Sequence, residues 1–134
     1  MGATTLELHA LRNSIIVEPL KVTATTKAKK PNTLYVGSPT DDFPEAGEKS
    51  NVEEYINDAT IKYKKIIVVA DSLYKVINVL GKVAYKDFFI LIDDVDSFQR
   101  DSTFRGSLEL CMDTYKMFPR DRRAISQKRY YLIY

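Results

Sequence analysis

A run of five apolar residues, Phe88–Ile92, is the feature that most constrains how this chain can fold. A second run of the same kind occupies residues 66–70. Strands that are apolar at every position are typical of a parallel sheet with helices on both faces, because a sheet with one wet face alternates apolar and polar residues. The two runs therefore predict an α/β fold with a mainly parallel sheet.

The remainder of the chain alternates strand and helix patterns. Further strands are expected at residues 14–17, 34–36, 124–125 and 130–133. Helical spacing predicts helices at residues 4–11, 20–30, 50–59, 71–80 and 104–115. Ser50 and Glu53 form a capping-box pattern, which predicts that the third helix begins at Ser50. Residues 40–49 are typical of an exposed loop, and the alternation as a whole favours a single layered α/β domain over residues 1–134.

The composition excludes several classes of protein. The 134 residues carry a net charge of +2, too small to indicate a nucleic-acid or membrane partner by itself. One cysteine allows no internal disulfide, and no apolar run approaches the roughly 20 residues that span a bilayer. The first residues do not resemble a signal peptide. We expect a cytoplasmic protein without a membrane partner, in the host cytoplasm if the gene is phage, viral or plasmid-borne.

Three carboxylates, Asp93, Asp94 and Asp96, follow the 88–92 strand directly. In open α/β sheets, ligands bind at the carboxyl ends of the strands, so these residues predict a metal and nucleotide site. The alternative is a solvated acidic turn that caps the next helix, a role that the nearby Asp101-Ser102 also favours. Three carboxylates within four positions favour the nucleotide site.

Three segments carry a resemblance to a known family. They are Ile66-Ile-Val-Val-Ala-Asp-Ser-Leu-Tyr-Lys-Val76, Tyr85-Lys-Asp-Phe-Phe-Ile-Leu-Ile-Asp-Asp-Val-Asp-Ser-Phe98 and Ser14-Ile-Ile-Val-Glu-Pro-Leu-Lys21. They resemble the first RecA-like domain of superfamily-two (DEAD-like) helicases, most closely the replication origin-binding helicases of herpesvirus type and their phage or mobile-element relatives. The second segment is similar to helicase motif II, Asp-Glu-x-Asp, and the third to motif Ia. The resemblance implies a RecA-like P-loop NTPase fold, ATP and Mg²⁺ as cofactors, and single-stranded DNA as a partner in replication.

The resemblance also implies roles for individual residues. Asp93 would hold Mg²⁺, and Asp94 would stand where the family has the glutamate that activates the attacking water. Asp96 would couple motif II to motif III at Ser126. Gly2, Thr4 and Thr5 would be the final part of the P-loop and bind the nucleotide, with Thr4 or Thr5 at the Mg²⁺-binding hydroxyl position.

Two departures from the family pattern concern the P-loop and motif III. Ala3 stands where the P-loop has its lysine, and the strand and glycine-rich loop that should come first are absent. Gln127-Lys128 replaces the Ala-Thr of motif III, and no second RecA-like domain follows. We therefore expect a truncated or degenerate copy with weak or absent ATP hydrolysis. A RecA-like sheet without its first strand should leave a central gap or apolar edges, which favour self-association.

The remaining residues that bear on function are two groups of basic residues, the one histidine and the one cysteine. Lys27, Lys29 and Lys30 follow the motif Ia region and would face nucleic-acid phosphates, although a charge run is more often a solvated face. A second basic group lies near the end of the chain, at Arg120, Arg122, Arg123, Lys128 and Arg129. We expect His9 on a helix surface and Cys111 in the core. The alternative to an ATPase domain is a non-catalytic α/β interaction module or a degenerate fragment.

Overall fold

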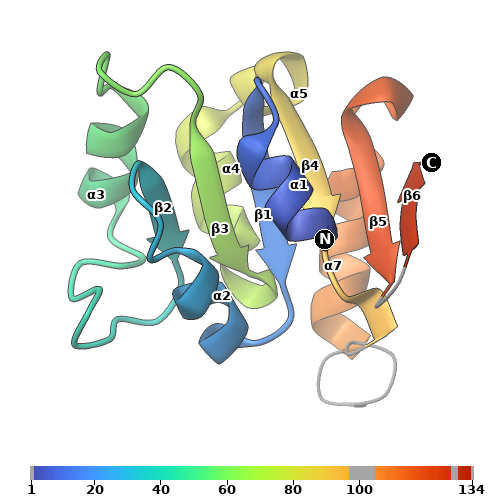
Figure 1. Ribbon diagram of the computed structural model, residues 1–134, viewed down its shortest axis with the longest axis horizontal. Coiled ribbons are helices and arrows are strands. Elements are labelled where there is room, and N and C mark those ends of the chain that lie inside the picture. Colours follow the sequence, from blue (N-terminus) through green and yellow to red (C-terminus); the bar gives the residue numbers. More distant parts are fainter. Residues whose placement is uncertain (1, 97–104, 128–129, 134) are drawn as a thin grey trace.

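The computed structural model describes residues 2–96, 105–127 and 130–133 of the chain. The described strands form one six-stranded sheet in the order β2-β3-β1-β4-β5-β6, shown in Figure 1. Strands β1 to β5 run parallel to one another, and β6 pairs antiparallel with β5 at the edge. Their bounds are β1 Asn13–Glu18, β2 Thr33–Val36, β3 Lys65–Val69, β4 Phe88–Ile92, β5 Arg123–Gln127 and β6 Tyr130–Ile133. The predicted α/β class and the mainly parallel sheet are confirmed.

Helices cover both faces of the sheet. On one face, in front in Figure 1, lie α1 (Ala3–His9) and α2 (Lys21–Lys27). On the other face lie α3 (Lys49–Ile56), α4 (Leu73–Leu80), α5 (Val83–Asp87) and α7 (Arg105–Tyr115). Short 3₁₀ turns precede α4 at Ala70–Ser72 and β5 at Arg120–Arg122.

Each central strand supplies side chains to both faces, which explains its continuous apolar sequence. In β1, Ile15 and Val17 belong to the core beneath α4 and α7, whereas Ile16 belongs to the core beneath α1 and α2. All three side chains are fully buried. Burial of one such side chain stabilises the fold by roughly 1.5–3 kcal/mol, so apolar residues are favoured at every position of the strand.

The predicted strands agree with the observed ones to within about two residues at each end, as is usual for boundary assignments. The prediction of a capping box at Ser50 is wrong. Helix α3 begins at Lys49 after Glu48, without a side-chain capping hydrogen bond, so Ser50 already lies inside the first turn. Gly81 ends α4 with a φ of 58°, as expected of a C-terminal glycine. Helix α5 was not predicted, since five residues are too few to show a helical period.

The expected central gap in the sheet is also wrong. Among the described strands the sheet is continuous through its centre, where β1 pairs with both β3 and β4, and β4 pairs with β5. At one edge β6 pairs with β5 from Ala124↔Ile133 to Gln127↔Tyr130, and the self-association expected from apolar edges stays a prediction.

The one cysteine and the one histidine lie where the sequence predicts. Cys111 is buried, with its thiol 3.5 Å from the carbonyl O of Ala70, and burial, with a smaller effect from Asp71, raises the pKa of this thiol to about 12. His9 is exposed, with Nδ1 2.8 Å from the carbonyl O of Thr5. A thiol with so high a pKa is a core residue rather than a nucleophile.

Some predicted features lie outside the described residues. These are positions 97–99 of the acidic stretch, Asp101-Ser102, Phe104, Lys128 and Arg129. Within the described part of the chain, no helix combines the length and apolar character needed to cross a bilayer.

Candidate functional site

The carboxyl ends of β1 and β4 lie side by side at one edge of the sheet. Their register pairs Val17 with Ile92, and the backbone N–H of Asp93 donates to the carbonyl O of Val17 at 2.9 Å. Directly after these positions come two carboxylates, Glu18 and Asp93, which are 0% and 8% exposed. The parallel register therefore brings two buried carboxyl groups together at the edge where α/β proteins bind ligands.

The first turn of α1 brings a hydroxyl group to these carboxylates. Thr4 Oγ1 donates to Asp93 Oδ2 at 2.7 Å and lies 3.3 Å from Glu18 Oε1. Thr4 itself is buried. The two residues to which the resemblance assigns a shared Mg²⁺ ion are thus in direct contact, although 89 positions separate them in the sequence.

An ammonium group lies among the same oxygens. Lys27, in the last turn of α2, points its Nζ at Asp93 Oδ2 (2.7 Å), Glu18 Oε1 (3.0 Å) and Thr4 Oγ1 (3.1 Å). Three acceptors match the three protons of an ammonium. We call Thr4, Glu18, Lys27 and Asp93 the Lys27 cluster.

The charges within the Lys27 cluster are strongly coupled. Burial, with the nearby charge of Asp93, raises the pKa of Glu18 to about 8 against the opposing effect of Lys27. Burial acts to raise the pKa of Asp93, but hydrogen bonds from Lys27, Glu18 and Thr4 outweigh it and lower this pKa. Burial acts to lower the pKa of Lys27, but the two carboxyl groups outweigh it and raise that pKa. At neutral pH the cluster therefore holds the carboxylate of Asp93, the ammonium of Lys27 and the protonated carboxyl group of Glu18. The two charges cancel without a metal ion.

One oxygen of the cluster is not used by these contacts. Glu18 Oε2 is buried, and no N–H or hydroxyl group of the described residues donates to it. Buried polar atoms in proteins are nearly always paired, so this oxygen indicates capacity for a further donor or cation.

Asp94 and Asp96, the other two carboxylates of the predicted site, are more exposed to solvent than Asp93. Asp94 has a φ of 51°, in the left-handed region that Asp tolerates better than most residues, and this bend turns the chain at the end of β4. Asp94 and Asp96 are half-buried. Ser126, the predicted partner of Asp96, is buried and donates its hydroxyl to the carbonyl O of Gln127 at 2.9 Å.

The predicted nucleotide-binding residues lie at the start of α1, and the predicted nucleic-acid-binding lysines lie at the end of α2 and just after it. Gly2 precedes α1 with extended backbone, and a Cβ there would meet open space, so the protein's own packing does not require glycine. Thr5 is half-buried beside Thr4. Lys29 and Lys30 are exposed, whereas the neighbouring ammonium of Lys27 is turned into the cluster, so the three lysines do not form one surface.

Sequence reasoning missed Glu18 and the position of Lys27. A signal existed for Glu18, which ends an apolar strand as Asp93 does and is followed by Pro19. Lys27 lies three residues after Ala24, which is buried against the sheet, so its side chain emerges close to the inner face of α2. Nothing in the sequence distinguishes its ammonium from those of Lys29 and Lys30.

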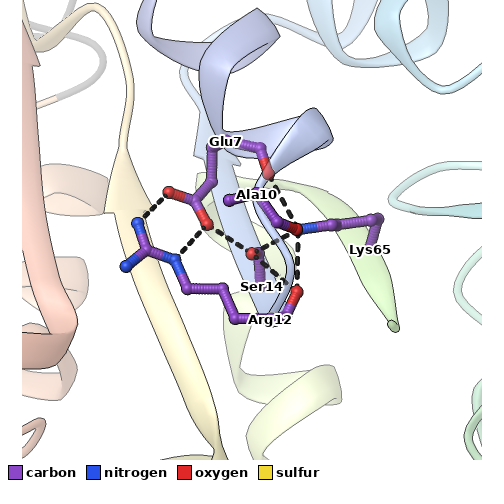
Figure 2. Close-up of polar contacts among 5 residues, drawn as sticks. All are labelled: Glu7, Ala10, Arg12, Ser14 and Lys65. Atoms are coloured by element: carbon purple, nitrogen blue, oxygen red, sulfur yellow. Dashed lines mark hydrogen bonds and ion pairs between the residues drawn. The ribbon is translucent and has the colours of Figure 1, made fainter. Parts of the chain in front are cut away.

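A second buried polar group, shown in Figure 2, fixes the opposite end of α1. Glu7 is 1% exposed and accepts from Arg12 through both carboxylate oxygens, at 2.8 Å from Nε and 2.5 Å from Nη2. Ser14 Oγ donates to the same carboxylate at 2.5 Å. The guanidinium of Arg12 also stacks 3.6 Å from the ring centroid of Phe89. The buried charge of Glu7 is therefore matched by a two-point ion pair and a hydroxyl donor.

Lys65, at the start of β3, completes this second group. Its Nζ donates to the carbonyl oxygens of Glu7 (2.8 Å), Ala10 (2.8 Å) and Arg12 (2.7 Å) and lies 3.0 Å from Ser14 Oγ, as drawn in Figure 2. These carbonyls belong to the last turn of α1 and the segment after it, where the carbonyl oxygens of Glu7 and Ala10 also accept from the backbone N–H groups of Ala10 and Arg12. Burial and Arg12 lower the pKa of Lys65 to about 8, against the attraction of Glu7. The ammonium thus caps α1 from the neighbouring strand.

Comparison with known proteins finds one limited similarity. No protein-family model matches the chain, and no solved structure matches it. Protein PFC0760c of Plasmodium falciparum (isolate 3D7) is 32% identical over 61 residues, which is 46% of this chain and 2% of that protein. A similarity of this extent does not define a family for the chain.

Glu18→Gln should change the pH dependence of stability in metal-free buffer. The carboxyl pKa is raised above its unfolded value of about 4.3, so the folded state holds a proton that the unfolded state releases, and stability falls as pH rises towards 8. Glutamine has no such proton. In urea unfolding with EDTA, the variant should gain more than about 1 kcal/mol relative to the original chain between pH 5 and pH 8. The control Glu54→Gln, at an exposed position, should follow the original chain, and parallel curves for all three proteins would contradict the assignment.

Lys65→Met should destabilise the fold because it removes the ammonium that donates to three carbonyl oxygens and lies beside the Ser14 hydroxyl. We expect a loss of about 2 kcal/mol in the free energy of unfolding, since the removed cost of burying the ammonium offsets part of the lost hydrogen bonding. Lys62→Met, at an exposed position, should change stability by less than about 0.5 kcal/mol. Equal stability of the two variants in chemical denaturation would show that Lys65 does not hold α1.

Proposed function

We propose that this chain is the ATP-binding domain of a helicase-type ATPase, a RecA-like domain of the superfamily-two kind that acts on DNA in replication, with impaired hydrolysis. The observation that carries the proposal is the 2.7 Å contact between Thr4 Oγ1 and Asp93 Oδ2 at the carboxyl edge of a parallel sheet. P-loop NTPases hold Mg²⁺ with a Ser or Thr at the start of a helix and an Asp at the end of a strand. Here Thr4 lies in the first turn of α1 and Asp93 directly follows β4, which supports the proposal.

The donor atoms present suit a magnesium ion. Mg²⁺ prefers oxygen ligands and is commonly bound through one or two carboxylates while nucleotide phosphates and water complete its shell. Asp93, with Thr4, would hold the ion, and the unused Oε2 of Glu18 lies in the same cluster. When bound, Mg²⁺ neutralises phosphate charge during transfer of the γ-phosphoryl group to water. Gly2 and Thr5 would lie beside the nucleotide.

Three features of the chain support impaired hydrolysis. Ala3 provides no ammonium at the position of the P-loop lysine. Asp94 is one methylene shorter than the glutamate expected there, and a displacement on the order of 1 Å can lower a rate about 10²-fold. Lys27 fills the space between the oxygens that would hold the metal ion.

In the same proposal, DNA is the macromolecular partner. Lys29 and Lys30 are exposed just after α2 and are available to phosphates, whereas Lys27 is not while it occupies the cluster. Asp96 and Ser126 would couple the nucleotide site to the rest of the domain.

A non-catalytic α/β interaction module is the second candidate, and one observation favours it. The ammonium of Lys27 satisfies the charge of Asp93 without any metal ion or nucleotide. A domain that had abandoned its chemistry would retain the sheet and fill the former site in this way.

Binding of a fluorescent ATP analogue, with Mg²⁺ and with EDTA, separates the two candidates. The ATPase proposal predicts binding that depends on Mg²⁺ and weakens at least about tenfold in Asp93→Asn, because a charged ligand of the ion is lost. Asp87→Asn, an exposed aspartate at the end of α5, should bind as the original chain does. Binding that is absent, or that ignores both Mg²⁺ and Asp93, would favour the interaction module. ATP turnover that requires Mg²⁺ and is lost in Asp93→Ala would contradict impaired hydrolysis.

A further inference from the structure

The ammonium of Lys27 occupies the position of a bound cation. Its Nζ is held by oxygens from three separate elements: the first turn of α1, the end of β1 and the residue after β4. The 2.7 Å distance to Asp93 Oδ2 is that of a charge-assisted hydrogen bond, and the distances to Glu18 Oε1 (3.0 Å) and Thr4 Oγ1 (3.1 Å) lie in the range of ordinary N–H···O hydrogen bonds. Oxygens that converge from three elements on one positive charge are also able to surround a small metal cation.

We propose that the oxygens of Thr4, Glu18 and Asp93 form a site for a divalent cation, Mg²⁺ or Mn²⁺, and that Lys27 competes with the ion for this site from within the chain. The ion binds when the lysine side chain leaves. This inference deepens the proposed function and rests on it for the biological ligand, a nucleotide with Mg²⁺.

The donor set supports a divalent ion rather than an ion pair alone. Glu18 is 0% exposed, and no N–H or hydroxyl group of the described residues donates to its Oε2. A purely structural ion pair is stable only when its remaining lone pairs are satisfied. The described residues contain no group of three or more His, Cys, Asp or Glu side chains that could hold a metal. Once Glu18 releases its proton to solvent, two carboxylates with a hydroxyl fit an ion that completes its shell with water and phosphate.

The packing of α2 against the sheet does not depend on the Lys27 side chain. The body of α2 is anchored by Ala24 and Ala28, which are buried in the core, and not by the lysine. The Lys27 side chain is 30% exposed, so a path to solvent is open along its flexible four-carbon stem. While it remains, its charge stabilises Asp93, and the chain is able to fold without a metal ion.

Titration with Mn²⁺ alone, followed by the loss of the free-ion signal in electron paramagnetic resonance, tests the inference. Lys27→Met should bind one Mn²⁺ per chain at least about tenfold more tightly than the original chain, because the competing charge is gone. Lys29→Met removes an equal charge two residues away at an exposed position and should behave as the original chain. Lys27→Met/Asp93→Asn should lose the gained affinity.

Equal Mn²⁺ affinity of Lys27→Met and Lys29→Met would overturn the inference, as would a gain that survives Asp93→Asn. Two carboxyl groups without a counter-charge could leave Lys27→Met unfolded in EDTA. In that event the inference predicts that Mn²⁺ restores the far-ultraviolet circular dichroism of Lys27→Met but not of the double variant, and failure to restore it overturns the inference. No nucleotide is present in these measurements, so their outcome is distinct from that of the ATP-analogue experiment.

Discussion

The parallel sheet places two buried carboxyl groups, those of Glu18 and Asp93, side by side. The arrangement of the side chains on the α1–α2 face of the sheet depends on these two groups. A buried carboxylate is costly unless an opposite charge and hydrogen-bond donors accompany it. The donors come from the two helices on the same face, as Thr4 from α1 and Lys27 from α2. Four elements that are separate in the sequence are thus joined at one point of the carboxyl edge.

The position of Thr4 is set by contacts at both ends of α1. A seven-residue helix is too short to be stable by itself, and Leu6 in its middle is 50% exposed, so apolar burial gives it limited support. Its first turn is held by Asp93, and its last turn by Lys65 and the Glu7–Arg12 ion pair, which are drawn in Figure 2. Polar contacts therefore determine where the hydroxyl of the candidate site lies.

Much of the framework was predictable from sequence because it depends on apolar patterning. The runs that became β3 and β4 are apolar at every position, and only strands covered on both faces need this pattern. The prediction that Asp93 ends a buried strand follows from the same run. The capping box at Ser50 failed because the helix begins one residue earlier than the pattern suggested, with Glu48 before it.

The partners of the charged residues were not predictable in the same way. Glu18 and Asp93 are 75 positions apart, and only the β1–β4 register makes them neighbours. Lys27 looks like Lys29 and Lys30 in the sequence, and its ammonium is distinguished only by the oxygens that the fold brings within its reach. Such contacts are decided by tertiary structure, which a local sequence pattern does not record.

The central claim is that Lys27 and Asp93 are energetically coupled inside this cluster. A double-mutant cycle of Lys27→Met and Asp93→Asn, measured by urea unfolding in metal-free buffer, tests it most directly. The 2.7 Å ion pair predicts an interaction energy of at least about 1 kcal/mol, because removal of either partner leaves the other buried without its counterpart. An interaction energy within about 0.3 kcal/mol of zero would mean that the two side chains act independently, and it would contradict the account.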